Sequence, residues 1–174
     1  MRKKLLYLLV FGIAVFLLTA CGSKTQEQVV EQLKSKVEQM NGYKLQGNMI
    51  LSMGNEEQEY EVEVWHSKPD FYRVHLKNAK NDQSQMILRN KEGVFVLTPA
   101  LNKSFKFQSE WPSNTSQPYL YESLITDILE DEDSKYTEKE NQYVFETKTR
   151  YQYHKMSPIQ EITFDKSNLK PASA

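Results

Sequence analysis

The feature that most constrains the fold is a change of hydrophobic period at Tyr43. Between residues 43 and 108, apolar and polar side chains alternate within a series of short segments, which is the pattern of strands with one buried face. The segments are separated by short, turn-like stretches. Strands joined in this way pair antiparallel, because a parallel pair needs a crossover of about a dozen residues or more. The sequence therefore predicts an antiparallel meander.

The alternation places the strands and their faces. In the second strand, Glu59, Glu61 and Glu63 alternate with apolar residues, so we expect an acidic side that faces solvent. A loop over residues 110–117 interrupts the meander, and further strands follow it. The expected strands cover residues 43–53, 59–65, 71–77, 84–89, 94–98, 103–108, 135–140, 143–149 and 159–165.

Two amphipathic helices are expected. Thr25 and Gln28 have the spacing of a capping box, apolar residues then recur at helical spacing, and Asn41 with Gly42 supplies the stop. A second helix is expected to begin with Pro118 in its first turn. We expect it to end at the acidic run 130–133, because negative charge is unfavourable beside a helix C-terminus. The fold class is therefore α+β.

The N-terminus has the pattern of an export signal. Arg2, Lys3 and Lys4 precede an uncharged apolar run over residues 5–18, which is shorter than the about 20 residues of a spanning helix. The ending Leu-Thr-Ala-Cys at residues 18–21 resembles the bacterial lipobox. We interpret residues 1–20 as a lipoprotein signal peptide, Cys21 as the lipid attachment site and residues 21–26 as a tether. The resemblance implies a diacylglyceryl anchor on the extracytoplasmic face of the cell membrane.

Signatures of catalysis are weak. The chain has no phosphate-binding glycine motif, no GxSxG elbow and no HExxH. A single cysteine excludes an intramolecular disulfide. Two of His66, His75 and His154, together with Glu61 or Glu63, could in principle bind a metal ion, but exposed histidines on strands are common. We therefore expect no enzyme activity, no cofactor and no metal site, and the acidic balance of the mature chain opposes nucleic-acid binding.

Several motifs carry a resemblance to known proteins. KPDFYR at residues 68–73, EGVFV at 92–96, and Pro99 with Asn102 and Lys103 resemble the LolA/LolB lipoprotein-carrier family over residues 27–165. The stretch 60–122, with LTPALNKSF at 97–105, is similar to the YdcC-type sporulation lipoproteins of Bacillus-like bacteria. The resemblance implies a strongly curved antiparallel sheet, a half-barrel with helices on its concave face. Residues 27–174 would form this LolA-like domain without the last strands of the family.

The same resemblance implies a cavity for an acyl chain or another hydrophobic group. A curved sheet with one apolar face must be filled by its own helices or enclose a ligand, so a plain core remains an alternative for each residue. The expected lining consists of apolar residues from the meander and the second helix: Met49, Leu51, Val62, Val64, Tyr72, Val74, Leu76, Met86, Leu88, Leu120 and Leu124.

These observations favour a non-catalytic, membrane-tethered envelope lipoprotein that handles lipoproteins or acts in sporulation or germination. A second hypothesis is a protein-binding scaffold or activator of an envelope enzyme, with Glu59, Glu61 and Glu63 or the loop 110–117 as its contact. A third is an envelope hydrolase that uses His66, Asp70 and His75.

Replacing Cys21 with Ala is expected to move the chain from the membrane fraction to the soluble fraction, because it removes the thiol that carries the acyl chains. Cell fractionation measures this. Ser23→Ala changes a nearby residue without touching the thiol and should leave the chain in the membrane fraction. Membrane retention of a processed Cys21→Ala chain would contradict the anchor.

Overall fold

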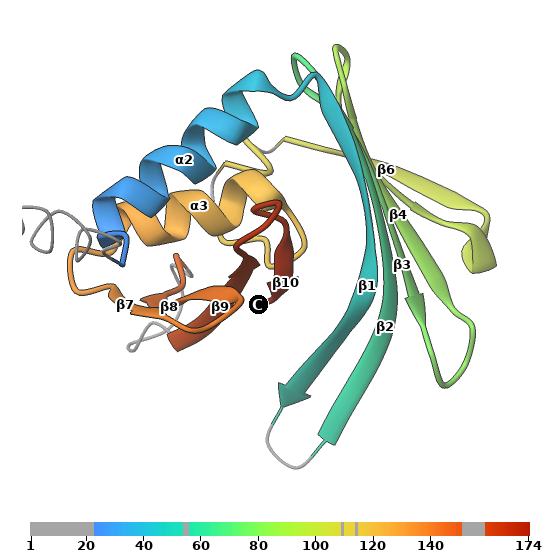
Figure 1. Ribbon diagram of the computed structural model, residues 1–174. Helices are drawn as coiled ribbons and strands as arrows, with labels where there is room; N and C mark the ends of the chain where they lie inside the picture. Colours follow the sequence, from blue (N-terminus) through green and yellow to red (C-terminus); the bar gives the residue numbers. More distant parts are fainter. Residues whose placement is uncertain (1–22, 54–55, 109, 114, 151–158) are drawn as a thin grey trace, which may run out of the picture.

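The computed structural model describes residues 23–53, 56–108, 110–113, 115–150 and 159–174. The described part of the chain forms two antiparallel sheets and two α-helices (Figure 1), so the α+β prediction is confirmed. The helices are α2 (Gln26–Gln39) and α3 (Tyr121–Glu130), with a 3-10 turn η1 (Pro99–Leu101). The strands are β1 (Gly42–Met53), β2 (Glu56–Ser67), β3 (Phe71–Asn78), β4 (Ser84–Asn90), β5 (Gly93–Thr98), β6 (Lys103–Phe107), β7 (Lys135–Glu138), β8 (Gln142–Lys148), β9 (Ile159–Asp165) and β10 (Pro171–Ser173).

The first six strands form the predicted meander, in the order β1-β2-β3-β4-β5-β6. Val64 lies opposite Leu45 on β1 and Val74 on β3, and Val74 lies opposite Ile87 on β4. Directly paired residues share a face of a sheet. We call the face that carries these residues the inner face, and the opposite face the outer face. Glu59, Glu61 and Glu63 lie on the outer face, as the sequence predicts.

The smaller sheet, in the order β10-β9-β8-β7, carries both helices. In Figure 1, α2 and α3 lie side by side over this sheet, between it and the upper part of β1. Val29 and Leu33 of α2, Leu124 and Ile128 of α3, and strand residues such as Phe145 and Phe164 form one buried core. The predicted capping box of Thr25 and Gln28 is present at the start of α2.

A second core covers the upper part of the inner face. It consists of Val62, Val64, Tyr72, Val74 and Val94 from the sheet, closed by Trp111 and Leu120 from the segment that connects β6 to α3. The connecting segment therefore covers this part of the inner face. At the start of β1, the close approach to β2 requires the glycine at position 42, because a Cβ there would lie 2.3 Å from the carbonyl oxygen of His66.

The structure differs from the expected architecture in three ways. The two sheets are separate and do not close into a barrel, so the curved half-barrel is not confirmed, and the helices pack mainly on the smaller sheet. Pro118 lies before the N-cap residue Leu120 and not in the first turn of α3. The short strand β10 was not predicted, because three residues are too few for a period-two pattern and its pairing with β9 is a tertiary contact.

Candidate functional site: a groove between the two sheets

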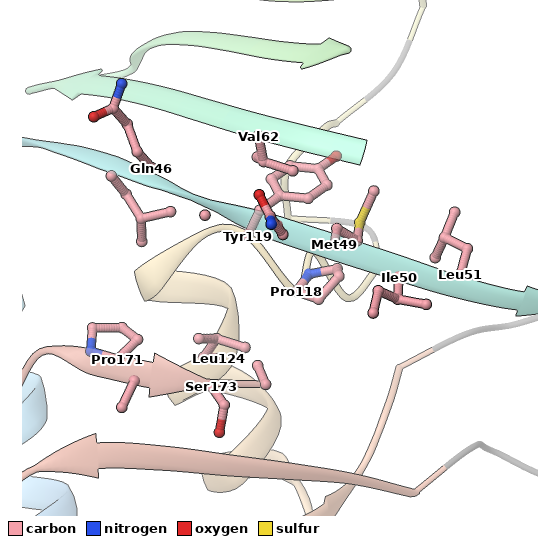
Figure 2. A pocket seen from close by; sticks show the side chains of 15 residues that line it. Gln46, Met49, Ile50, Leu51, Val62, Pro118, Tyr119, Leu124, Pro171 and Ser173 are labelled. Carbon is pink, nitrogen blue, oxygen red and sulfur yellow. The ribbon is translucent and has the colours of Figure 1, made fainter. Parts of the chain in front are cut away.

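A groove lies between the edge strand β1 of the large sheet and the edge strand β10 of the small one (Figure 2). Its volume is about 240 Å³, slightly below the range of about 300–1,000 Å³ for small-molecule sites. None of the side chains along the groove carries a formal charge. They come from β1 and β2, from the start of the α3 region and from the C-terminal strand: Leu45, Gln46, Gly47, Asn48, Met49, Ile50, Leu51, Val62, Pro118, Tyr119, Leu124, Pro171, Ala172, Ser173 and Ala174.

Gly47 keeps the groove open. It lies opposite Val62 on the inner face of the sheet, and a Cβ at this position would have nothing within 4 Å. On either side of it along β1, Leu45 and Met49 point to the same face and are half-buried. The absence of a side chain at Gly47 therefore leaves room between two apolar neighbours.

The structure brings four of the predicted lining residues together in this groove: Met49, Leu51, Val62 and Leu124. Leu51 is 40% exposed, so this end of the inner face is uncovered. Val64, Tyr72, Val74 and Leu120 lie instead within the second core, where the connecting segment covers them. Leu76 lies at the edge of that core. These five residues therefore belong to the hydrophobic core, which was the alternative to a cavity lining.

The prediction was wrong for Met86 and Leu88. On β4, Leu88 pairs with Arg73 and Met86 pairs with His75, whereas Ile87 pairs with the buried Val74. Met86 and Leu88 therefore lie on the outer face, away from the groove. The run Met86-Ile87-Leu88 is apolar at every position, so alternation alone does not decide which residues point inward.

A buried polar cluster links the large sheet to α3. His66 of β2 is 6% exposed, and its Nδ1 atom lies 3.2 Å from Oε1 of Glu122. Its ring stacks on Tyr72 with centroids 4.4 Å apart and tilts against Tyr43. The hydroxyl of Tyr43 donates to Oε2 of Glu122 at 2.7 Å. The expectation of an exposed strand histidine is therefore wrong for His66.

Burial and neighbouring charges shift the pKa values of two side chains in this cluster. Burial lowers the pKa of His66 below its ordinary value, and Lys68 acts in the same direction, while the carboxylates of Glu122 and Asp70 oppose the shift. Burial together with Glu122 raises the pKa of Tyr43 far above its ordinary value. Both shifts favour the uncharged form, of the imidazole of His66 and of the phenol of Tyr43.

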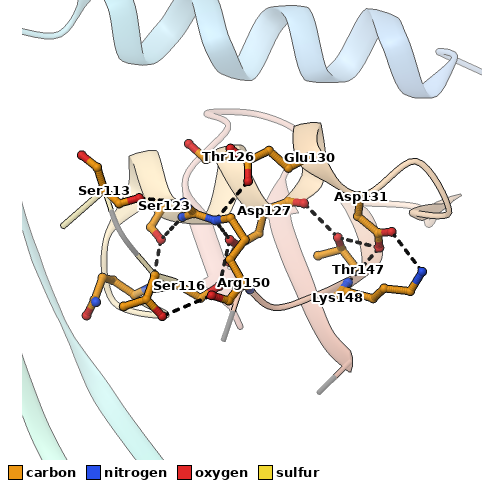
Figure 3. A network of polar contacts seen from close by, with 12 residues as sticks. Ser113, Ser116, Ser123, Thr126, Asp127, Glu130, Asp131, Thr147, Lys148 and Arg150 are labelled. Carbon is orange, nitrogen blue, oxygen red and sulfur yellow. Dashed lines mark hydrogen bonds and ion pairs between the residues drawn. The ribbon is translucent and has the colours of Figure 1, made fainter. Parts of the chain in front are cut away.

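A second polar network fixes the segment that precedes α3 (Figure 3). The Asp127 side chain is fully buried and accepts hydrogen bonds from Ser116 Oγ at 2.9 Å, Arg150 Nε at 2.5 Å and Gln160 Nε2 at 2.7 Å. Arg150 also donates to Ser123 Oγ at 3.0 Å. Sequence reasoning missed this network. A signal was present, because Asp127 falls among Leu124, Ile125 and Ile128 on the apolar stripe of α3.

The residues named for catalysis are not assembled. His66 lies on the inner face and His75 on the outer face, while Asp70 forms an ion pair with Arg89 at 2.9 Å. Across the described ranges, no three His, Cys, Asp or Glu residues are placed to hold a metal ion. Cys21 and His154 lie outside the described residues. No helix within those ranges is long and apolar enough to span a membrane.

Comparison with known proteins gives one strong relative. The chain is 54% identical over 172 residues to the sporulation protein YdcC of Bacillus subtilis (strain 168), which covers 99% of this chain and 51% of that protein. The chain thus spans about half the length of this curated relative. The YdcC part of the sequence-based resemblance is confirmed. No model of a protein family matches the chain, and the LolA/LolB part stays a prediction.

Among solved structures, a chain in the structure of the CwlD amidase from Clostridioides difficile in complex with the GerS lipoprotein matches with a TM-score of 0.43 and 16% identity. The match covers 86% of this chain and 84% of that chain. At this TM-score, the match carries no functional argument.

The buried histidine predicts how stability depends on pH. Because the pKa of His66 is lowered in the folded state, the unfolded chain binds more protons as the pH falls below about 6.5. The free energy of unfolding should therefore decrease as the pH falls through this region. Urea unfolding at about pH 7.5 and about pH 5.5 measures the decrease.

His66→Gln should make this decrease smaller, because it removes the group whose pKa differs between the folded and the unfolded chain. An equal pH dependence in the wild-type and His66→Gln chains would contradict the assignment.

Proposed function

We propose that the chain belongs to a sporulation protein of the cell envelope that binds an acyl chain or another hydrophobic group in the groove between its two sheets. The identity with YdcC supports the role in sporulation. The groove supports the binding role, and its uncharged lining is the observation on which the proposal rests.

The composition of the groove favours an apolar ligand. Leu45, Met49 and Leu51 line the groove from the inner face of β1. Leu124 of α3 and Pro171 of β10 lie on the other side of the groove (Figure 2). Burying apolar ligand surface against such walls contributes roughly 25 cal/mol per Å². No side chain along the groove would pair with a charged head group, which is expected to remain in solvent. Met49 adds a flexible side chain that adapts to ligands of different shape.

The proposal is of a non-catalytic protein. The groove lining contains no histidine, cysteine, acidic or basic side chain. Its hydroxyl groups belong to Tyr119 and Ser173, which hydrogen-bond to the uncharged side chains of Gln117 and Thr163 and have no general base among the side chains of the lining. His66 and Glu122 lie in the aromatic cluster with Tyr43 and Tyr72, where the hydrogen bond from Tyr43 to Glu122 joins β1 to α3. These placements favour binding over hydrolysis.

We further propose that Cys21 anchors the protein to the extracytoplasmic face of the membrane. The support is the lipobox-like sequence that ends at this residue. The backbone N–H of Lys24 donates to Oε2 of Glu138 on β7 at 2.9 Å. The described chain therefore begins beside the small sheet, and a short tether would hold that side of the molecule near the membrane.

A substitution at Gly47 tests the groove directly. Gly47→Phe places a ring in open space between Leu45 and Met49, so it should fill the groove without unfolding the sheet. We expect the affinity of the purified chain for the fluorescent fatty acid cis-parinaric acid to fall by about tenfold or more. A fluorescence titration measures the affinity, and thermal unfolding checks the fold.

Glu61→Phe is the matched control, because it adds the same ring to the outer face of the neighbouring strand β2. This variant should bind the probe like the wild-type chain. Equal binding by the wild-type and folded Gly47→Phe chains, or no binding by either, would overturn the proposed site.

A further inference from the structure

The outer face of the large sheet carries an apolar patch that the groove does not use. Four positions form one line across the strands: Trp65 pairs with Arg73, Arg73 with Leu88, and Leu88 with Phe95. Met86 and Leu97 form the adjacent pair. Together with Phe71 at the end of β3, these residues form what we call the outer patch: Trp65, Phe71, Met86, Leu88, Phe95 and Leu97.

No described element lies over the outer patch. In Figure 1, both helices and the small sheet lie on the other side of β1–β6. The six side chains are half-buried by their neighbours within the sheet alone. Contiguous large apolar side chains on an uncovered face mark interaction sites, and aromatic residues, Met and Arg are enriched in protein interfaces.

Three cations border the outer patch. Lys44 lies 4.9 Å and Arg73 lies 4.5 Å from the centre of the Trp65 ring, and Lys106 lies 5.6 Å from that of Phe95. Within the described part of the chain, none of the three lies within 4.0 Å of a carboxylate, whereas Lys77, Lys135 and Lys148 each have such a partner. The three cations at the patch thus have no ion pair among the described residues, while the acidic row of Glu59, Glu61 and Glu63 lies beside the patch on the same face.

Three kinds of occupant of the outer patch are disfavoured: a sugar, a second copy of the chain and a membrane. Lys44 and Arg73 already approach the Trp65 ring from both neighbouring strands, which leaves little open ring face for a sugar to stack on. A second copy docked patch to patch would bring the cations together, which costs free energy. The described chain begins beside β7 through the contact of Lys24 with Glu138, so the proposed tether lies away from the outer face and does not press it onto a membrane.

We propose that the outer patch docks a protein whose contact surface has an apolar centre surrounded by carboxylates. Carboxylates at the rim would pair with Lys44, Arg73 and Lys106, while the centre would cover Leu88 and its neighbours. This surface lies on the opposite face of the sheet from the groove. Docking at the outer patch therefore does not depend on ligand binding in the groove.

Site-specific photo-crosslinking in cells tests the docking. The full-length protein is produced in growing and sporulating cells with p-benzoylphenylalanine in place of Met86, at the centre of the patch. A second chain carries the same amino acid in place of Lys80, which is exposed in the turn between β3 and β4. We expect a protein adduct from position 86 that position 80 does not give, with the crosslinked partner surface rich in Asp and Glu.

Charge reversal on one strand supplies the matched control. Lys106 and Lys103 are both exposed on β6, but Lys106 pairs with the outer-face residue Phe95 and Lys103 pairs with Thr98 on the inner side. Lys106→Glu should lower the yield of the adduct by about fivefold or more, and Lys103→Glu should leave it unchanged. Thermal unfolding of the purified variants confirms that both are folded.

Four results would overturn the proposal: no adduct specific to position 86, an adduct with lipid or glycan, an adduct with the mass of a second copy, or equal adduct yields from the Lys106→Glu and Lys103→Glu chains.

Discussion

The buried carboxylate of Asp127 is the interaction on which the arrangement of the two sheets depends. It accepts hydrogen bonds from Ser116, Arg150 and Gln160, which belong to three separate parts of the chain. Removing one partner from a buried ion pair typically costs about 3–5 kcal/mol, because the other charge stays buried and unpaired. By fixing Ser116, the network also fixes the neighbouring segment, which places Trp111 on the inner face and Tyr119 beside the groove.

The large sheet therefore has a different role on each face. The upper part of its inner face is covered by the segment that Asp127 holds, and the lower part, around Met49 and Leu51, is left open as one wall of the groove. The outer face combines the acidic row of Glu59, Glu61 and Glu63 with the cation-bordered outer patch. The six-stranded sheet thus offers an apolar surface without charged side chains around Met49 and Leu51 on one face, and a charged, partly apolar surface on the other face.

How much of this could be predicted depends on how clearly the side chains alternate. On β1, β2 and β3 polar residues occupy most outer positions, with Ile50, Trp65 and Phe71 as exceptions, so the inward faces of these strands were predicted correctly. On β4 the run Met86-Ile87-Leu88 is apolar throughout, and only the pairing of Ile87 with Val74 decides the face. The Asp127 network joins residues far apart in sequence, so its partners could not be inferred from local pattern, although an acidic residue on an apolar helix stripe is a sign of a buried polar contact.

The central claim, that the groove holds a hydrophobic group, is tested most directly by native mass spectrometry of the full-length protein purified from its own membranes. The account predicts a bound lipid-sized mass in addition to the proposed covalent anchor, released on denaturation and absent from the Gly47→Phe chain. A wild-type protein that carries only its anchor, with the same native mass as the Gly47→Phe chain apart from the substitution itself, would contradict the account.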